Sequence, residues 1–253
     1  KTWIGNGTSA ELFVVWARDA SRPGRPVRGF VVRRSLQRPS ALTTRKIEHK
    51  TSLRILQNAH VSLDRAVCKA RDVLPPVGFA ESVGRVLERS RILVAWAPVG
   101  VSRSILELAA DFVRNREAFG APLVSNQIIQ EKLVRMTSTV SSMYLLAEKV
   151  TLDFMNGRAG MAAVAMAKAH NTRMGREIAA LGREIFGGKG ILLDSLVAMK
   201  FCDMEALHTY EGTYDVNILV AGREISGGID AIRSGEAVKR RFKKNKLTNK
   251  SKL

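Results

Sequence analysis

The chain has 253 residues, 45% of them hydrophobic, and carries a formal net charge of +18. Such a chain can bury a substantial core, in one large domain or in two smaller ones. The charge excess lies at the ends, because residues 73–229 hold 17 basic and 16 acidic side chains, against 15 and 5 in residues 1–72 and 9 and 2 in residues 230–253. A nearly neutral centre argues against a protein built around phosphate contacts. We therefore expect no specific nucleic-acid partner, and at most weak attraction of the basic ends to polyanions.

The residue types that carry chemistry exclude several other kinds of site. Cys68 and Cys202 lie far apart without a Cys-x-x-Cys spacing, so neither a disulfide framework nor a zinc site is indicated. The four histidines form no His-Glu-x-x-His pattern, and we expect no metal site. No run of 18 apolar residues occurs, so no membrane span is predicted. The chain starts at Lys1 in strand-like sequence, and we expect it to be a fragment whose beginning is missing.

Residues 1–74 are predicted to form short strands. Residues 12–17 are an apolar run rich in β-branched and aromatic side chains, and a turn-rich segment separates them from a second run at 29–32. Residues 47–56 and 59–63 are weaker strand candidates. Several strands without helices between them indicate the C-terminal part of an antiparallel β-domain.

Pro75-Pro76 marks the expected boundary with a helical domain. The first helix is predicted over residues 81–115, with a kink at Pro98. A second helix carries apolar residues at alternating spacings of four and three, which is typical of an antiparallel bundle: Ile129, Leu133, Met136, Val140, Met143, Ala147, Val150 and Phe154. A third, alanine-rich helix is predicted over 161–185.

These patterns predict an α+β fold: a partial antiparallel β-domain over 1–74, followed by a C-terminal antiparallel helical bundle over 75–229. Residues 230–253 form a basic tail without periodicity, which we expect to be disordered.

A lone carboxylate, Glu211, stands between an aromatic residue and Gly212, just before Thr213. Thr213 can cap a helix that the apolar spacing predicts after it, with Gly222 as its stop. A carboxylate at a helix start can act as a proton-abstracting base. It can equally do no more than complement the helix dipole, and spacing alone leaves both interpretations open.

The run Tyr210-Glu211-Gly212-Thr213, followed by Asp215 and residues 222–225, resembles the catalytic-base loop of the acyl-CoA dehydrogenase and oxidase superfamily. The glutaryl-CoA dehydrogenase branch and the plant-type peroxisomal short-chain acyl-CoA oxidases are the most similar branches. The resemblance implies an acyl-dehydrogenase-like fold, an acyl-CoA substrate and FAD. It makes Glu211 the base that takes the α-proton while a hydride leaves the β-carbon for the flavin. It also implies that Gly212 leaves room for the thioester, and that Thr213 and Asp215 contact the cofactor.

Two further segments match motifs of that superfamily that hold the nucleotide end of FAD across a subunit interface. The first is the Arg-x-x-Phe-Gly turn, with Arg116 as a cation for phosphate, Phe119 as an apolar wall, and Gln127 as the glutamine that follows. The second is the glycine-rich turn after the third helix, in which the implied cofactor residues are Glu184, Phe186, Gly187 and Gly188. Without the resemblance, a helix C-cap explains those glycines. The shared motifs imply a homodimer or a homotetramer.

At the start of the chain, Trp3 matches the aromatic residue that covers the flavin in that superfamily. The hydroxyl residue expected two positions later is Gly5, which departs from the dehydrogenase pattern and resembles the oxidases. The missing side chain leaves space for oxygen. Arg91 matches an arginine near the thioester and is a candidate substrate-binding residue; an ordinary surface cation is the alternative.

The chain ends in Ser251-Lys252-Leu253, a peroxisomal address read by an import receptor. From these features we expect a peroxisomal acyl-CoA oxidase that converts short-chain acyl-CoA and O2 to trans-2-enoyl-CoA and hydrogen peroxide. The first alternative is a glutaryl-CoA-type dehydrogenase that passes electrons to a flavoprotein. The second is a non-catalytic helical scaffold or basic nucleic-acid binder. The acyl-chain length cannot be read from the sequence.

Overall fold

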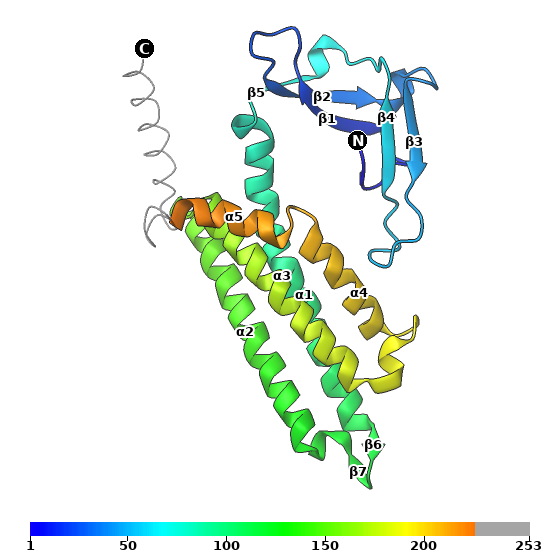
Figure 1. Ribbon diagram of the computed structural model, residues 1–253, viewed down its shortest axis with the longest axis vertical. Coiled ribbons are helices and arrows are strands. Elements are labelled where there is room, and N and C mark those ends of the chain that lie inside the picture. The colour runs from blue at the N-terminus through cyan, green and yellow to red at the C-terminus, as the bar shows by residue number, and fades with distance from the viewer. Residues whose placement is uncertain (226–253) are drawn as a thin grey trace. The chain divides into compact units, whose positions relative to one another are not determined.

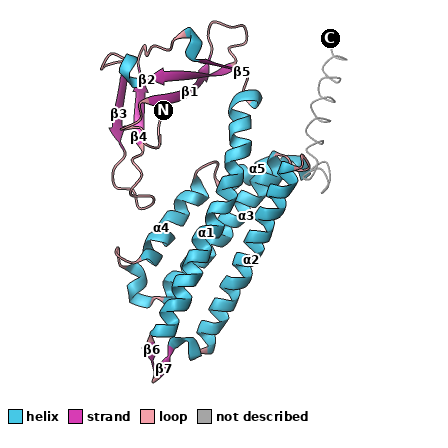
Figure 2. Ribbon diagram, turned by 180° about the vertical axis from the view of Figure 1, so that it is seen from behind, coloured by secondary structure: helices cyan, strands magenta, loops and turns pink. Residues whose placement is uncertain are grey.

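The computed structural model describes residues 1–225. The basic tail expected over 230–253 and the tripeptide Ser251-Lys252-Leu253 lie outside the described residues. The chain divides into two compact units, one spanning Lys1–Leu87 and one beginning at Glu88. Strands make up the first unit and helices dominate the second (Figures 1 and 2), which confirms the predicted α+β fold class.

The first unit contains two antiparallel sheets. Strands β1 (Leu12–Arg18), β2 (Val27–Arg33) and β5 (Val73–Val77) form one sheet in the order β1-β2-β5. Strands β3 (Leu42–Lys46) and β4 (Ala59–Leu63) form a separate pair. The strands predicted at 12–17, 29–32 and 59–63 are confirmed.

Two strand predictions in this unit are wrong. Residues 47–56 form no strand, because the Lys50 ammonium donates to the carbonyl oxygens of Leu53 at 2.9 Å and Leu56 at 2.5 Å, which curls the segment into turns. The strand expected around Trp3 is reduced to a single β-bridge between Ile4 and Ala59, followed by a turn.

The core of the first unit forms where strand residues of both sheets meet. Phe13 of β1 and Val32 of β2 pack with Leu42 and Val61 from the β3–β4 pair, and all four are buried. In the larger sheet, Gly29 stands opposite Trp16, and a Cβ on this glycine would lie 2.7 Å from the indole. Gly29 therefore gives the Trp16 ring the space that it occupies.

β5 contains Pro75 and Pro76, the two residues expected to end the β-domain. Proline has no N–H to donate, but β5 is the edge strand of its sheet, where this loss is tolerated. Its pairing with β2 includes a register shift, and the Arg28 side chain adds a bond by donating to the Leu74 carbonyl at 3.3 Å. Because β5 continues through both prolines, they do not end the first unit. The division between the two units lies after Leu87, whereas the sequence predicts it at residue 75.

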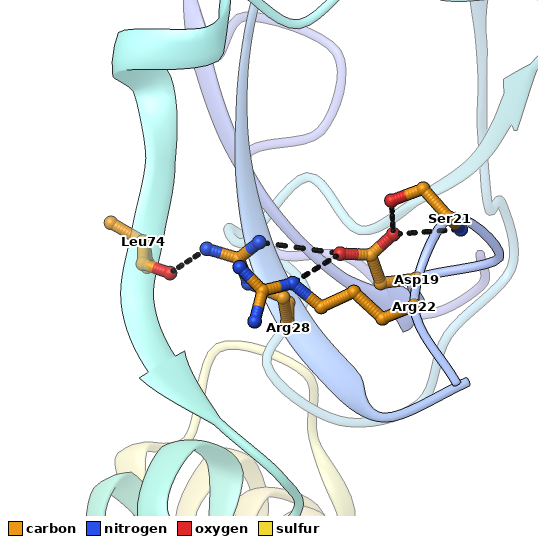
Figure 3. Close-up of polar contacts among 5 residues, drawn as sticks. All are labelled: Asp19, Ser21, Arg22, Arg28 and Leu74. Carbon is orange, nitrogen blue, oxygen red and sulfur yellow. Dashed lines mark hydrogen bonds and ion pairs between the residues drawn. The ribbon is translucent and has the colours of Figure 1, made fainter. Parts of the chain in front are cut away.

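A polar cluster built on Asp19 closes the connection between β1 and β2 (Figure 3). The Asp19 carboxylate accepts bonds from the Ser21 hydroxyl at 2.6 Å and the Ser21 amide at 3.1 Å. Arg28 donates to its other oxygen at 3.2 Å, and Arg22 pairs with the same oxygen at 3.6 Å. These contacts join the β1–β2 turn to β5 through Arg28. The Ser21 bonds lower the pKa of Asp19 most; burial opposes this shift and Arg28 supports it.

Up to Ile225, where the described residues end, the helical unit contains five α-helices. They are α1 (Arg85–Asn115, which begins in the last residues of the first unit), α2 (Gln127–Met155), α3 (Met161–Ile185), α4 (Leu196–Thr209) and α5 (Tyr214–Ile225). The short strands β6 (Glu117–Ala118) and β7 (Ala121–Pro122) form a hairpin between α1 and α2. The predictions for α1, α2 and α3 are confirmed, although a π-helical turn over Ala80–Gly84 precedes α1. Pro98 lies inside α1.

α3 is the central helix of this unit, packed against α2, α4 and α5. Small residues make this close packing possible: a Cβ on Gly175 would lie 2.7 Å from Met204 of α4, and one on Gly182 would collide with Ile105 of α1. The predicted seam of α2 faces the same core through Met136 and Met143, both fully buried. The small residues of α3 therefore allow the neighbouring helices to pack close to it.

Two features of α4 and α5 differ from the sequence prediction. α4 was not predicted, because its apolar residues do not gather on one face. Gly222 does not stop α5, which continues to Ile225.

The helical stretch Ala80–Asn115 is long and apolar enough to cross a membrane, judged by length and composition alone. A core helix of a folded bundle meets the same test. Ile105, Ala109 and Val113 of this stretch are fully buried against the other helices. We therefore interpret it as a core helix.

The Asp19 cluster gives a pH-dependent prediction. Since folding lowers the pKa of Asp19, its stabilising contribution is present above about pH 4 and is lost as the pH falls through the folded pKa. Asp19→Asn should lower the free energy of unfolding at about pH 6, and its difference from wild type should shrink towards about pH 3. Urea unfolding at both pH values measures this. Asp64→Asn, at an exposed carboxylate of the same unit, is the matched control and should change little; a constant Asp19→Asn difference would contradict the assignment.

Candidate active site

Glu211 lies in the short connection between α4, which ends at Thr209, and α5, which begins at Tyr214. Its φ is +56° and that of Gly212 is +92°, so two consecutive residues adopt left-handed backbone. A non-glycine residue in this region costs free energy and persists only where its surroundings hold it. Thr213 caps α5, since its hydroxyl accepts from the Val216 amide at 3.4 Å, as the sequence predicts.

Side chains from three helices hold the carbonyl groups of this loop. Arg91 of α1 donates through Nε to the Glu211 carbonyl at 3.1 Å. Lys168 of α3 donates to the Gly212 carbonyl at 2.7 Å and to the His208 carbonyl at 3.2 Å. Asn217 of α5 also donates to the Gly212 carbonyl at 2.7 Å, and to the Thr213 carbonyl at 3.0 Å. All three donors are buried, so the loop is fixed from inside the bundle.

The Glu211 side chain is only half-buried, and one of its oxygens accepts a hydrogen bond from the Ser90 hydroxyl at 3.0 Å. The amide N–H groups of Glu211 and Gly212 donate to no acceptor within residues 1–225. The loop thus combines an oriented carboxylate with two adjacent free amide donors. This arrangement can take up a proton and stabilise a developing negative charge.

Two buried cations lie close to this carboxylate. Burial, supported by the Arg91 charge and opposed by Glu211, lowers the pKa of Lys168 to about 8. Burial also lowers the pKa of Arg91, again opposed by Glu211. Tyr210, next to the carboxylate, has its pKa raised by burial and by Glu211. Glu211 is therefore the negative charge that both buried cations share.

A second group of predicted residues lies where α1 ends, α2 begins and α3 ends. Arg116 is exposed after the end of α1. Phe119, at the tip of the β6–β7 hairpin, is 98% exposed and has a φ of +57°. Gln127 is the exposed first residue of α2. A ring and a cation that nothing in the described chain covers are available to a ligand.

The glycine-rich turn after α3 belongs to the same group. A Cβ added to Gly187 or Gly188 would meet no atom within 4 Å, so this backbone is open to close approach. Phe186 instead stacks on Phe112 of α1, with ring centroids 4.3 Å apart. The Glu184 carboxylate accepts from Lys132 at 2.7 Å, and this bond lowers its pKa. A cavity of about 390 Å³ adjoins the turn and is lined in part by Phe186, Lys189 and Leu196.

The two groups stand at opposite ends of the helical unit. α1 rises by about 36 Å from Arg91 to Asn115, at 1.5 Å per residue. The structure thus brings Glu211, Arg91, Gly212 and Thr213 together, with Asp215 exposed in the first turn of α5. The FAD motif residues gather elsewhere, and Trp3 belongs to the first unit, where its side chain is 61% exposed.

Ser90, Lys168 and Asn217 were missed by sequence reasoning. Lys168 had one signal, because it is the only charged residue between Met161 and Ala169. Asn217 similarly interrupts an apolar run in α5. The three residues come together only in the tertiary structure, and no local sequence pattern indicates that they do.

Comparisons with known proteins identify the family of this chain. Residues 78–226 match the family model described as acyl-CoA dehydrogenase, C-terminal domain. The mitochondrial short-chain specific acyl-CoA dehydrogenase of Rattus norvegicus is 30% identical over 223 residues, which is 87% of this chain and 53% of the relative. The mitochondrial isovaleryl-CoA dehydrogenase of Oryza sativa is 25% identical, over 89% of this chain and 55% of the relative.

A solved structure gives the same result for the fold. A glutaryl-CoA dehydrogenase from Mycobacterium smegmatis in complex with FADH2 superposes with a TM-score of 0.82 at 29% identity, covering 90% of this chain and 57% of that one. The chain spans about half the length of the curated relatives it matches. Members of the matched family are FAD flavoproteins, so the cofactor predicted from the sequence is confirmed.

The peroxisomal location expected from Ser251-Lys252-Leu253 is wrong. The rat and rice relatives are mitochondrial enzymes, and their similarity extends over most of the chain. A terminal tripeptide carries little information beside a match of that length. The import receptor predicted as a partner loses its basis with this correction.

Gly212 offers a test of the loop. A Cβ there would lie 3.0 Å from the Asn217 amide nitrogen and 3.2 Å from an Arg91 guanidinium nitrogen, on a left-handed backbone. Gly212→Ala should lower the free energy of unfolding by about 1–3 kcal/mol in urea titrations. Gly222→Ala is the matched control, because an added Cβ there meets nothing within 4 Å, and helix propensity makes it neutral or stabilising by about 1 kcal/mol. Equal effects of the two substitutions would contradict the strained loop.

Proposed function

Because the chain belongs to the acyl-CoA dehydrogenase family, we propose that the complete protein oxidises the C2–C3 bond of short-chain acyl-CoA thioesters. The observation that supports this most is the Glu211 loop, in which three buried side chains fix the backbone of a half-buried carboxylate. The similarity to short-chain relatives favours short acyl chains over long ones.

In this proposal the Glu211 carboxylate takes the α-proton of the thioester and becomes a neutral acid. The electron pair left at C2 shifts towards the thioester oxygen, where the free amide N–H of Glu211 donates to it, as in an oxyanion hole. Ser90 keeps the carboxylate oriented, and Gly212 leaves space beside it for the substrate. Arg91 acts on the substrate through the loop carbonyl that it holds. FAD, when bound, accepts the hydride from C3.

The residues of the second group fit the nucleotide end of FAD. Arg116 offers an exposed cation for phosphate, Phe119 an uncovered ring, and Gly187 and Gly188 an open backbone. Gln127 adds an exposed amide. Glu184 and Phe186 are engaged by Lys132 and Phe112, so we assign them to holding the turn. For the flavin end, we keep Trp3, Thr213 and Asp215 as contacts.

The separation of the two groups supports a homo-oligomer. A distance of about 36 Å along α1 keeps the carboxylate of one subunit away from the nucleotide-binding residues of the same subunit. We therefore propose that each FAD is shared by two copies of the chain, in a dimer or a tetramer.

For the electron acceptor we propose O2. Gly5 has no steric reason in its own fold, because an added Cβ would meet only the Leu56 methyl groups at 3.8 Å and 3.9 Å. Because packing does not require a glycine at this position, we assign Gly5 a functional role, which is to leave space for oxygen. The alternative is transfer to an electron-transfer flavoprotein, as in a glutaryl-CoA-type dehydrogenase, which the dehydrogenase relatives favour.

Glu211→Gln tests the base. The amide keeps the size of the side chain but cannot take the proton, so oxidation of butyryl-CoA should fall by at least about 10²-fold. Dye reduction by the full-length protein measures the rate, across an acyl-CoA series. The flavin absorbance of the variant should stay as in wild type, which separates chemistry from cofactor binding. A full-length protein without flavin absorbance would favour the non-catalytic alternatives.

Gly5→Ser tests the acceptor. A hydroxymethyl group has room at this position and should reduce oxygen access, so hydrogen peroxide formed per butyryl-CoA oxidised should decrease while dye reduction continues. Peroxide and enoyl-CoA are measured in the same sample. Should the wild-type protein form no peroxide while it reduces dye or a flavoprotein, the dehydrogenase alternative holds.

A further inference from the structure

Lys168 is a lysine with no exposed surface, on the central helix α3. Its ammonium group donates to the Gly212 and His208 carbonyls, and no carboxylate within residues 1–225 forms an ion pair with it. Lys168 has the Glu211 charge nearby but, among the described residues, no carboxylate in direct contact, and a buried cation in this position is costly unless its hydrogen bonds are made.

The two carbonyls held by Lys168 belong to the two sides of the Glu211 loop. His208 is in the last turn of α4, where a cation also complements the helix dipole, and Gly212 immediately follows Glu211. Lys168 therefore fastens the segment that enters the loop and the segment that leaves it to the same point on α3. Asn217 donates to the same Gly212 oxygen, so both lone pairs of that carbonyl are used.

Fixing a carbonyl fixes the plane of its whole peptide group, because that unit is rigid. With the Glu211 carbonyl held by Arg91 and the Gly212 carbonyl held by two donors, the loop cannot rotate its peptides without breaking buried hydrogen bonds. The Gly212 N–H belongs to the peptide group whose carbonyl Arg91 holds, so its direction is fixed. Within residues 1–225 neither this N–H nor that of Glu211 donates to an acceptor.

We propose that Lys168 is a positioning residue for the reaction: it holds the Gly212 and His208 carbonyls inside the bundle, so that the Glu211 carboxylate and amide stay aligned with the thioester. This inference rests on the proposed function and assigns a role to a side chain that does not itself touch the substrate. Without Lys168, the Gly212 carbonyl keeps only the bond from Asn217, about which the loop can turn.

The test is exchange of the α-protons of butyryl-CoA in D2O, followed by NMR, on the dithionite-reduced holoenzyme. Reduced flavin takes no hydride, so this reaction reports proton transfer by the loop alone. Lys168→Met should slow the exchange by about 10- to 100-fold, the order expected for misaligned reacting groups, with a much smaller change in the butyryl-CoA concentration for half-saturation.

Asn171→Leu is the matched control. Asn171 lies three residues further along α3, is equally buried, and donates to the Ala95 and Met143 carbonyls at 3.0 Å, away from the loop. The substitution should destabilise the fold as Lys168→Met does but leave the exchange rate within about 3-fold of wild type. Equal slowing in both variants would mean that Lys168 acts through general stability, and would overturn the proposal.

Lys168→Gln keeps the test decisive if Lys168→Met does not fold. The shorter, neutral amide retains donors but reaches fewer carbonyls. The exchange rate of Lys168→Gln should therefore lie between those of Lys168→Met and wild type. If Lys168→Met cannot be measured, the rate of Lys168→Gln should still be lower than that of wild type. A wild-type rate in either Lys168 variant contradicts the inference. Absence of exchange in the wild-type holoenzyme contradicts instead the proposed function, so the two failures are distinguishable.

Discussion

The helical unit depends on the attachment of a left-handed loop to the interior of the bundle. Glu211 and Gly212 adopt backbone that costs free energy, and this cost is met by charged and polar donors from α1, α3 and α5. The donors themselves need the loop, because Arg91 and Lys168 are buried cations whose partners are its carbonyls and the Glu211 charge. Loop and donors thus stabilise each other. A stretch of left-handed backbone thus coincides with the candidate base.

In the first unit, side chains likewise supply hydrogen bonds that the backbone alone does not form. The prolines of β5 remove two amide donors, and the pairing with β2 shifts register. Arg28 supplies a bond to the Leu74 carbonyl and at the same time pairs with Asp19, which closes the β1–β2 turn. A single guanidinium therefore connects the β1–β2 turn to the edge strand β5.

Local patterns in the sequence predicted most of the fold. The apolar run at residues 12–17 forms β1, the heptad seam of α2 is buried in the bundle, and the alanine-rich α3 forms a helix that is buried along most of its length. β5 was missed because Pro75-Pro76 indicates a break unless the strand is known to lie at an edge. α4 was missed because it has apolar residues on all sides. An element is predicted when its own residues show a pattern typical of a helix or strand. It is missed when only its position in the fold explains its residues.

The candidate site divides in the same manner. Glu211 and Gly212 form a contiguous motif that resemblance to a family can identify, whereas Ser90, Lys168 and Asn217 come from three helices and meet only after packing. The location predicted from the last three residues is wrong, because the relatives that match most of the chain are mitochondrial enzymes.

The packing of α1 against α3 has a consequence for how such a chain can change over time. Both helices extend from the Glu211 loop to the glycine-rich turn, and Gly182 accepts Ile105 at a contact too close for any other residue. Inserting one residue into either helix would advance everything beyond it by about 1.5 Å and turn it by about 100°. Substitutions on the outer surfaces are free of this restriction. The lengths of α1 and α3 are therefore constrained. During evolution this bundle can accept substitutions on its outer surface far more easily than insertions or deletions within these two helices.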